Sequence, residues 1–189
     1  MKVLDKLLLL FLAAVLFPLS LQAQLPPNQP EQDCINALPV CQNTFVQPNS
    51  YQGEGLNPNE IDSGPSCMNS GERNDVWYIF TTQTAGFVGF SITPVNLTDD
   101  YDWAVYNLTN NSCADIFTTP SLEISCNWSG ASGVTGPNGL PGAQNEPLIP
   151  VNAGETYVIN VSNFSGTGTG YTLDFSPSTA TRPLPTTVL

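Results

Sequence analysis

The sequence predicts an all-β domain, an antiparallel β-sandwich of the jelly-roll kind. Short segments in which apolar and polar residues alternate recur along the chain. Clusters of Gly, Pro and Asn separate these segments at the intervals expected of turns. No segment after the N-terminal region has apolar residues at the helical spacing of 3.6. Many short strands joined by turns are typical of sandwiches and jelly rolls.

Residues 1–23 are expected to be a secretory signal peptide rather than part of the fold. Lys2 and Lys6 precede an apolar run from 7 to 17, and Ala23 offers a small residue before a cut at Gln24. The alternative is a membrane anchor. Pro18 ends the apolar run well short of the roughly 20 residues that a membrane span needs, which favours the signal peptide. We therefore expect a secreted protein or one on the outer cell surface.

The remaining 166 residues are strongly acidic. They carry 15 acidic side chains against Arg73 and Arg182 alone, a net charge of −13, with no lysine and no histidine. Because binding to phosphate backbones depends on Lys and Arg, nucleic acid and anionic membranes are poor partners. Cations, neutral glycans and basic protein patches are better ones.

Catalysis has little support because the usual bases, histidine and lysine, are missing. A paired-carboxylate glycosidase site among Glu54, Glu60, Glu72 and Glu123 is the remaining enzymatic alternative. We expect a protein that is not an enzyme.

The sequence predicts a short helical turn and a series of strands between irregular segments. Residues 24–32 form a Pro-rich lead-in, Asp33 is expected to cap a short helical turn, and 47–73 is a long irregular segment. Residues 76–81 are apolar on both faces, as in a strand buried between two layers. The other expected strands span 86–93, 103–108, 122–127, 148–149, 156–163 and 171–175, and apolar and polar residues alternate at 86–93, 156–163 and 171–175. The domain thus spans 33–177, and 178–189 is a linker or a truncated tail.

Five cysteines remain, and in an exported chain they are expected to be bridged. Cys113 and Cys126 flank a segment that looks like a loop between strands, and we predict a disulfide between them. Cys34, Cys41 and Cys67 then supply a second bridge and an odd thiol, with the pairing left open.

An acidic loop leads into the strand at 103–108. Asp99, Asp100 and Asp102, with Glu72 before the strand at 76–81, supply the hard oxygen ligands that Ca²⁺ prefers. Alternation places Asp100 and Asp102 on the same side of an extended chain, which suits a shared ion. The spacing is not that of an EF-hand loop, and the alternative is a solvated acidic turn.

The three tryptophans have different expected roles. Trp77 and Trp103 lie within strand patterns and are expected to fill the core. Trp128 lies at the edge of a Gly-rich loop, where an exposed ring would offer a stacking platform for a sugar.

An ordered series of motifs resembles a known family. These motifs are Gly-Glu-Arg-Asn-Asp-Val-Trp-Tyr-Ile-Phe at 71–80, Asp-Tyr-Asp-Trp-Ala-Val-Tyr at 100–106, Cys-Asn at 126–127, Ala-Gly-Glu-Thr-Tyr at 153–157, Asn-Phe-Ser at 163–165 and Gly-Tyr-Thr-Leu-Asp-Phe at 170–175. The series resembles the N-terminal domain of large surface proteins from gliding Bacteroidota, which continue into PKD-type repeats and a sorting domain for type IX secretion. It is also similar to CUB domains and bacterial pre-peptidase C-terminal domains, jelly-roll binding modules of which some hold calcium.

The resemblance implies a non-catalytic binding or adhesion module at the cell surface that recognises a glycan or protein. No repeats or sorting domain follow Phe175, so the chain is expected to be either a truncated reading frame or a small free-standing relative. The alternatives are a structural subunit of a surface layer or filament, in which exposed edge strands pair between copies, and an accessory domain of a larger secreted protein or enzyme.

Overall fold

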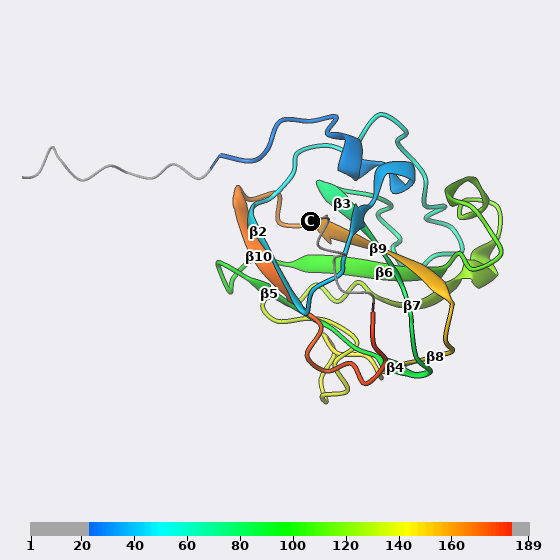
Figure 1. Ribbon diagram of the computed structural model, residues 1–189. Helices are drawn as coiled ribbons and strands as arrows, with labels where there is room; N and C mark the ends of the chain where they lie inside the picture. Colours follow the sequence, from blue (N-terminus) through cyan, green and yellow to red (C-terminus); the bar gives the residue numbers. More distant parts are fainter. Residues whose placement is uncertain (1–22, 183–189) are drawn as a thin grey trace, which may run out of the picture.

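The computed structural model describes residues 23–182, and within them the chain is an all-β sandwich, as the sequence predicts. The predicted signal peptide and the end of the predicted tail lie outside the described residues. Figure 1 shows β2, β10 and β5 grouped on one side of the molecule and β3, β9, β6 and β7 on the other.

The strands form two main sheets and a short ribbon. The larger sheet is antiparallel except for the parallel pair β1 and β3. Its order is β1 (Leu38–Pro39), β3 (Asp75–Thr81), β9 (Thr156–Asn163), β6 (Tyr101–Asn107) and β7 (Glu123–Asn127). The smaller sheet has the order β2 (Thr44–Asn49), β10 (Thr169–Asp174) and β5 (Ser91–Pro94), and the ribbon joins β4 (Gly86–Val88) to β8 (Ile149–Val151). Four single-turn 3₁₀ helices complete the elements, η1 (Pro30–Gln32), η2 (Cys34–Asn36), η3 (Cys113–Asp115) and η4 (Pro120–Leu122).

The main core lies between the two sheets. Alternate residues of β3, β6 and β9 face β5, β10 and the ribbon, so that each strand buries one row of side chains. Trp103 is fully buried and packs edge-on against Phe90, with 5.2 Å between the ring centroids. The buried hydroxyls of Tyr78 and Tyr171 lie 2.6 Å apart and hydrogen-bond across the two sheets.

A second apolar cluster covers the outer face of the larger sheet. Trp77, Ala104 and Tyr106 point away from the main core and pack against the 50–74 segment, η2 and the chain around η3 and η4. The central strands of this sheet are therefore buried on both faces. This confirms the prediction for 76–81, and Trp77 and Trp103 both lie in the interior as expected.

Two strand predictions need correction. The strand expected at 86–93 is divided into β4 and β5, which pair with different partners, β8 and β10. The division falls at Gly89, whose backbone N–H and C=O both bond the Ser178 hydroxyl instead of a neighbouring strand. β2 has no counterpart among the expected strands, and its residues 47–49 fall in the segment expected to be irregular. It is an edge strand, where Pro48 is tolerated.

Both ends of the predicted domain extend further than 33–177. Gln32 in the lead-in is fully buried, and its side-chain amide donates to the carbonyl oxygens of Gln52 and Gly53. At the other end, Ala180 and Arg182 are buried against the sandwich. Residues 178–182 therefore belong to the domain rather than to a linker.

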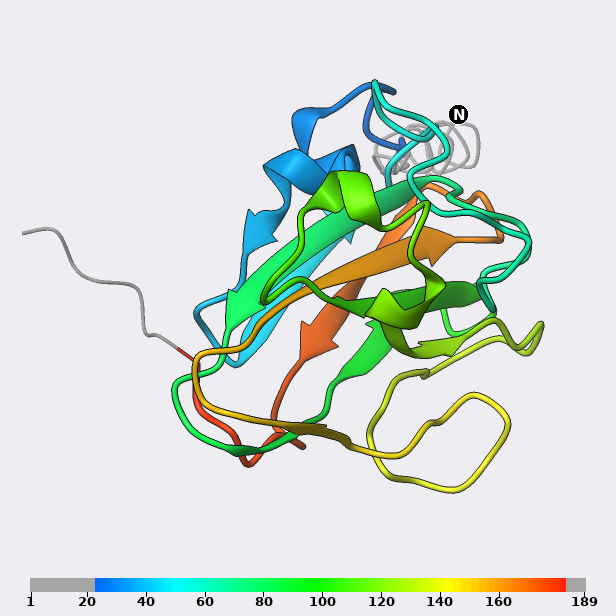
Figure 2. The ribbon, with the colours of Figure 1, turned by 90° about the vertical axis from the view of Figure 1, so that its right-hand side faces the viewer.

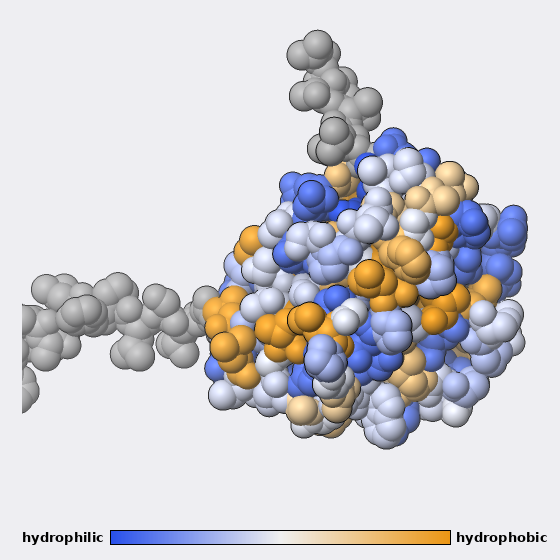
Figure 3. Space-filling model, turned by 90° about the horizontal axis from the view of Figure 1, so that it is seen from below, coloured by the Kyte–Doolittle hydropathy of each residue, from blue (hydrophilic) through white to orange (hydrophobic). Residues whose placement is uncertain are grey.

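One end of the molecule is formed by the ribbon and the long 128–148 connection between β7 and β8, drawn in yellow at the bottom of Figure 2. Figure 3 views this end and shows apolar surface between polar regions. Phe87 and Leu140 are exposed there and line a shallow groove with Pro147 and Leu148.

Candidate functional site

Asp99, at the start of the acidic loop, has a structural role in the fold. Its buried carboxylate accepts hydrogen bonds from the hydroxyl groups of Thr167, at 2.7 Å, and Thr169, and from the Asn96 amide at 3.2 Å. These bonds join the β5–β6 loop to the turn before β10 and to the first residue of β10. Both carboxylate oxygens of Asp99 are thus occupied within the protein.

Asp100 and Asp102 are placed differently. Asp102 lies in β6 and Asp100 directly precedes this strand, so alternation places both on the side opposite the core residues Tyr101 and Trp103. Each carboxylate is largely buried, and in each the Oδ1 oxygen has no hydrogen-bond donor. Burial, together with the neighbouring Asp100 charge, raises the pKa of Asp102 to about 7, and Arg73 acts in the opposite direction. The negative form of this pair is therefore disfavoured, and Arg73 offsets part of that effect at Asp102.

Asp75, in β3, lies on the same face of the larger sheet as Asp100 and Asp102, and we call these three aspartates the acidic row. Its partner in the strand register is Ser162 of β9, and Ser162 is also the partner of Asp102 on the other side. The fully buried Asp75 accepts a hydrogen bond from the Asn160 amide at 2.6 Å, while its Oδ1 has no partner. Four buried side-chain polar atoms within residues 23–182 lack a partner, and three of them are these aspartate oxygens.

Glu72 forms a neighbouring acidic group with Glu60, within the 50–74 segment. Its carboxylate accepts hydrogen bonds from the Trp77 indole N–H, at 3.1 Å, and from the Glu60 backbone N–H, at 2.6 Å. Burial and the Glu60 charge raise the pKa of Glu72 to about 8, and burial raises that of Glu60 to about 7. Burial and the Glu72 charge also raise the pKa of Asp75. Of the four acidic residues expected to share an ion, the structure brings together Asp100 and Asp102.

Of the residues expected to hold an ion, Asp100 and Asp102 are the two that could contribute oxygen ligands to a shared hard cation. A buried carboxylate oxygen without a donor is costly, and a Ca²⁺ ion would satisfy it because Ca²⁺ takes oxygen ligands. In the described part of the chain, the one group of three metal-ligating side chains with ligand atoms all within 4.8 Å is Cys67, Glu123 and Cys126. Its two cysteines are joined in a disulfide, so their sulfurs are not available as thiolate ligands.

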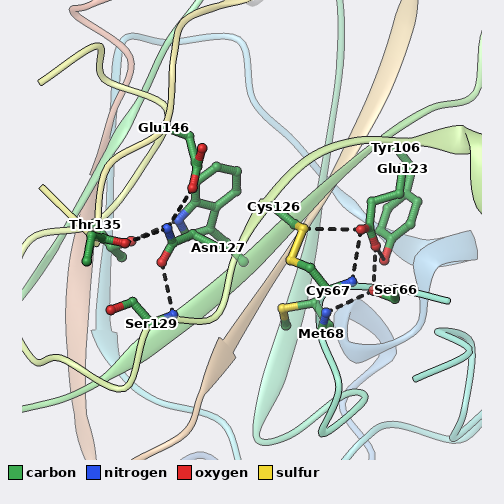
Figure 4. Close-up of a disulfide and its surroundings, with 12 residues drawn as sticks. Ser66, Cys67, Met68, Tyr106, Glu123, Cys126, Asn127, Ser129, Thr135 and Glu146 are labelled. Carbon is green, nitrogen blue, oxygen red and sulfur yellow. Dashed lines mark hydrogen bonds between the residues drawn. A yellow bond between two sulfur atoms is a disulfide. The ribbon is translucent and has the colours of Figure 1, made fainter. Parts of the chain in front are cut away.

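The predicted disulfide between Cys113 and Cys126 is wrong. Cys113 is bonded to Cys34, and Cys126 is bonded to Cys67. The reason is that η3 lies against η2, whereas β7 lies beside the chain at 66–68. Glu123 of β7 holds this chain by accepting hydrogen bonds from the Ser66 hydroxyl and the Cys67 N–H (Figure 4). Both bridges therefore fasten the N-terminal half of the chain to the 113–127 region. Cys41 is the odd thiol.

Trp128 follows β7 directly and is 53% exposed, as expected from its place beside a Gly-rich loop. It lines an open groove of about 570 Å³ together with Asn127, Ser129, Glu146 and the Cys67–Cys126 bridge. Figure 4 shows the polar part of this groove: the Asn127 amide donates to Glu146 at 2.9 Å and accepts from the Ser129 N–H at 3.1 Å. An aromatic face thus lies beside amide, hydroxyl and carboxylate groups.

Sequence reasoning did not identify two features of this surface. Asp75 was visible as an acidic residue at the start of a buried strand, two positions before Trp77 and so on the same face. No local sequence pattern indicates Glu146, because its hydrogen bond with Asn127 joins residues 19 positions apart in the chain.

No protein-family model matches this chain, and no curated protein matches it. Within residues 23–182, no helix has the length and apolar character required to cross a bilayer. The two disulfides are typical of proteins from oxidising compartments.

Proposed function

We propose that this protein is an exported, non-catalytic binding module that recognises a glycan through the groove around Trp128. The observation that carries this proposal is the half-exposed Trp128 ring beside the polar groups of Ser129 and Glu146, the second of which accepts a hydrogen bond from the buried Asn127 amide. Sugars bind proteins by laying an apolar ring face on an aromatic side chain while polar groups engage the hydroxyls. The two disulfides and the expected signal peptide support an extracellular location.

Hydrogen bonds within the protein preorganise the groove, which favours binding of a ligand. Asn127 is the last residue of β7, and its amide also donates to the Ala143 carbonyl oxygen at 2.9 Å. These contacts fasten the 128–148 loop to the sheet edge, so that little ordering is needed when a ligand binds.

Binding to a glycan array tests the proposal. We expect Trp128→Ala to abolish binding while retaining the melting temperature, because the ring is half exposed. Phe117→Ala is the matched control, since Phe117 is also an aromatic ring about half exposed, lies outside the groove, and its loss should leave binding unchanged. An array without hits, or equal binding by Trp128→Ala, would refute the glycan proposal, and concentration-dependent assembly in light scattering would favour the structural alternative.

A Ca²⁺ ion at Asp100 and Asp102 is the second part of the proposal. It is supported by the unpartnered Oδ1 atoms of the two carboxylates. Ca²⁺ should raise the melting temperature of the wild-type protein relative to chelator, and the double variant Asp100→Asn, Asp102→Asn should lose this response. Glu54→Gln, an exposed carboxylate without a hydrogen bond in the described structure, should keep it. Identical melting of the wild-type protein with Ca²⁺ and with chelator would rule out a stabilising ion.

A further inference from the structure

A pocket of about 400 Å³ lies where the chain returns after β10. Its wall is the segment from Phe175 to Arg182, which is fixed to the sandwich by backbone hydrogen bonds. The N–H groups of Thr179 and Ala180 both donate to the Phe87 carbonyl oxygen, at 2.8 and 3.0 Å. The Gln83 N–H donates to the Thr181 carbonyl oxygen at 2.8 Å. The pocket is therefore a built feature of the fold.

Arg182 contributes a buried positive charge to this pocket. Its guanidinium carbon lies 4.2 Å from the centre of the Phe175 ring, and the side chain is 8% exposed. Its two hydrogen bonds go to neutral groups, the Asn43 side-chain oxygen at 3.1 Å and the Ser178 hydroxyl at 3.3 Å. The Nε–H has no partner, and it is the one unpartnered buried donor within residues 23–182.

Among residues 23–182, no acidic side chain lines the pocket beside the guanidinium of Arg182. Arginine has five N–H donors, and Arg182 uses two of them. None of the described residues that line the pocket carries a carboxylate. A buried charge without a counter-charge is costly, and a planar carboxylate matches the guanidinium best because it can accept two parallel hydrogen bonds. The chemistry of the pocket selects a small molecule that carries a carboxylate.

The same pocket contains the free thiol of Cys41. Cys41 is half buried and unbridged, whereas the other four cysteines form the two disulfides. Its remaining lining is polar, from Gln83 and from the hydroxyls of Ser176 and Thr179. A thiol beside a cationic, polar cavity is placed to react with a small disulfide that the cavity can hold.

We propose that this pocket is a thiol-modification site, in which Arg182 holds the carboxylate of a small disulfide and Cys41 captures half of it covalently. In the reaction the Cys41 thiol loses its proton to water, and its sulfur attacks one sulfur of the incoming disulfide. A new S–S bond forms to Cys41 as the old one breaks, and the departing thiolate takes up a proton. The number of disulfides is unchanged, so the step needs no other oxidant.

The test compares three disulfides on the purified protein with both native bridges formed, using intact-mass spectrometry to follow modification. The probes are oxidised glutathione, which carries carboxylates, neutral hydroxyethyl disulfide and cationic cystamine. We expect oxidised glutathione to modify the wild-type protein about tenfold faster than cystamine, after correction for the intrinsic reactivity of each probe toward a free thiol peptide. Cys41→Ser should not be modified.

Arginine variants provide the second comparison. Arg182→Gln should lose the preference for the anionic probe, whereas Arg73→Gln should retain it. Arg73 is the matched control because it also lies over an aromatic ring, that of Phe164, but outside the pocket. The proposal is overturned if the corrected rates are equal for the three probes, if Cys41 does not react, or if the main product is a dimer joined through Cys41. The probe comparison on the wild-type protein stands even if Arg182→Gln fails to fold.

Discussion

Replacing Asp102 by Asn tests whether the negative charge of Asp102, in the acidic row, destabilises the folded protein. The Asp102 pKa is about 7 in the folded protein, against an ordinary value of 3.8. Between these values the folded state holds a proton that the unfolded state has released, so the free energy of unfolding falls as pH rises. A shift of this size corresponds to about 4 kcal/mol as an upper bound, and screening by solvent and salt reduces it to about 2 kcal/mol.

The variant removes this titration while keeping the shape of the side chain. In chelator, Asp102→Asn should match the wild-type protein near pH 4 and exceed its stability by about 2 kcal/mol at pH 8, or roughly 4–8 °C in melting temperature. Urea unfolding followed by tryptophan fluorescence across this pH range measures the difference. The carboxylates that do not act on Asp102 titrate in both proteins and largely cancel. Loss of the Asp102 charge also relieves Asp100, which adds to the expected difference in the same direction.

Asp99→Asn provides the contrast, because its carboxylate accepts three hydrogen bonds. An amide would present N–H groups to donors, so this variant should be destabilised at every pH. A stability difference for Asp102→Asn that does not change with pH, or one that favours the wild-type protein at pH 8, would contradict the reasoning.

Two further predictions concern the framework. Tyr78→Phe should lower the free energy of unfolding by about 1–3 kcal/mol, because it leaves the buried Tyr171 hydroxyl without its partner at 2.6 Å. In a double-mutant cycle measured by denaturant unfolding, the variant with both tyrosines replaced by Phe should lose less than the sum of the two single variants. Gly170→Ala should be poorly folded in thermal melts, because its Cβ would lie 1.8 Å from the Gln47 carbonyl oxygen, whereas Gly130→Ala should melt like the wild-type protein since nothing lies within 4 Å of that position.

The strands could be predicted where side-chain alternation and burial coincide. Val88, Phe90 and Ile92 share a buried face as their spacing requires, even though the strand is divided at Gly89. Alternation reports which face a residue occupies, but not which strand is its neighbour. The division depends on the Ser178 hydroxyl, which is 89 positions away in the chain.

The candidate sites show the same limit. Asp100 and Asp102 share a face because they are two residues apart, and this local relation was predictable. Glu72 was separated from them by a tertiary contact, its bond to the Glu60 backbone, which no local pattern reveals. The cysteine pairs are likewise tertiary, with sequence separations of 79 and 59.

These tertiary links explain why acidic groups can be buried on the outer face of the larger sheet. The 50–74 segment places Glu60 and Glu72 against Asp75, where burial and mutual repulsion disfavour their charged forms. Repulsion alone would drive this segment away from the sheet as pH rises. The Cys67–Cys126 bridge opposes that movement, because it holds the segment to β7 whatever the charge of the carboxylates. Reduction of the bridges should therefore destabilise the protein more at pH 8 than at pH 5, and equal losses at the two values would show that the covering segment is held by its apolar contacts instead.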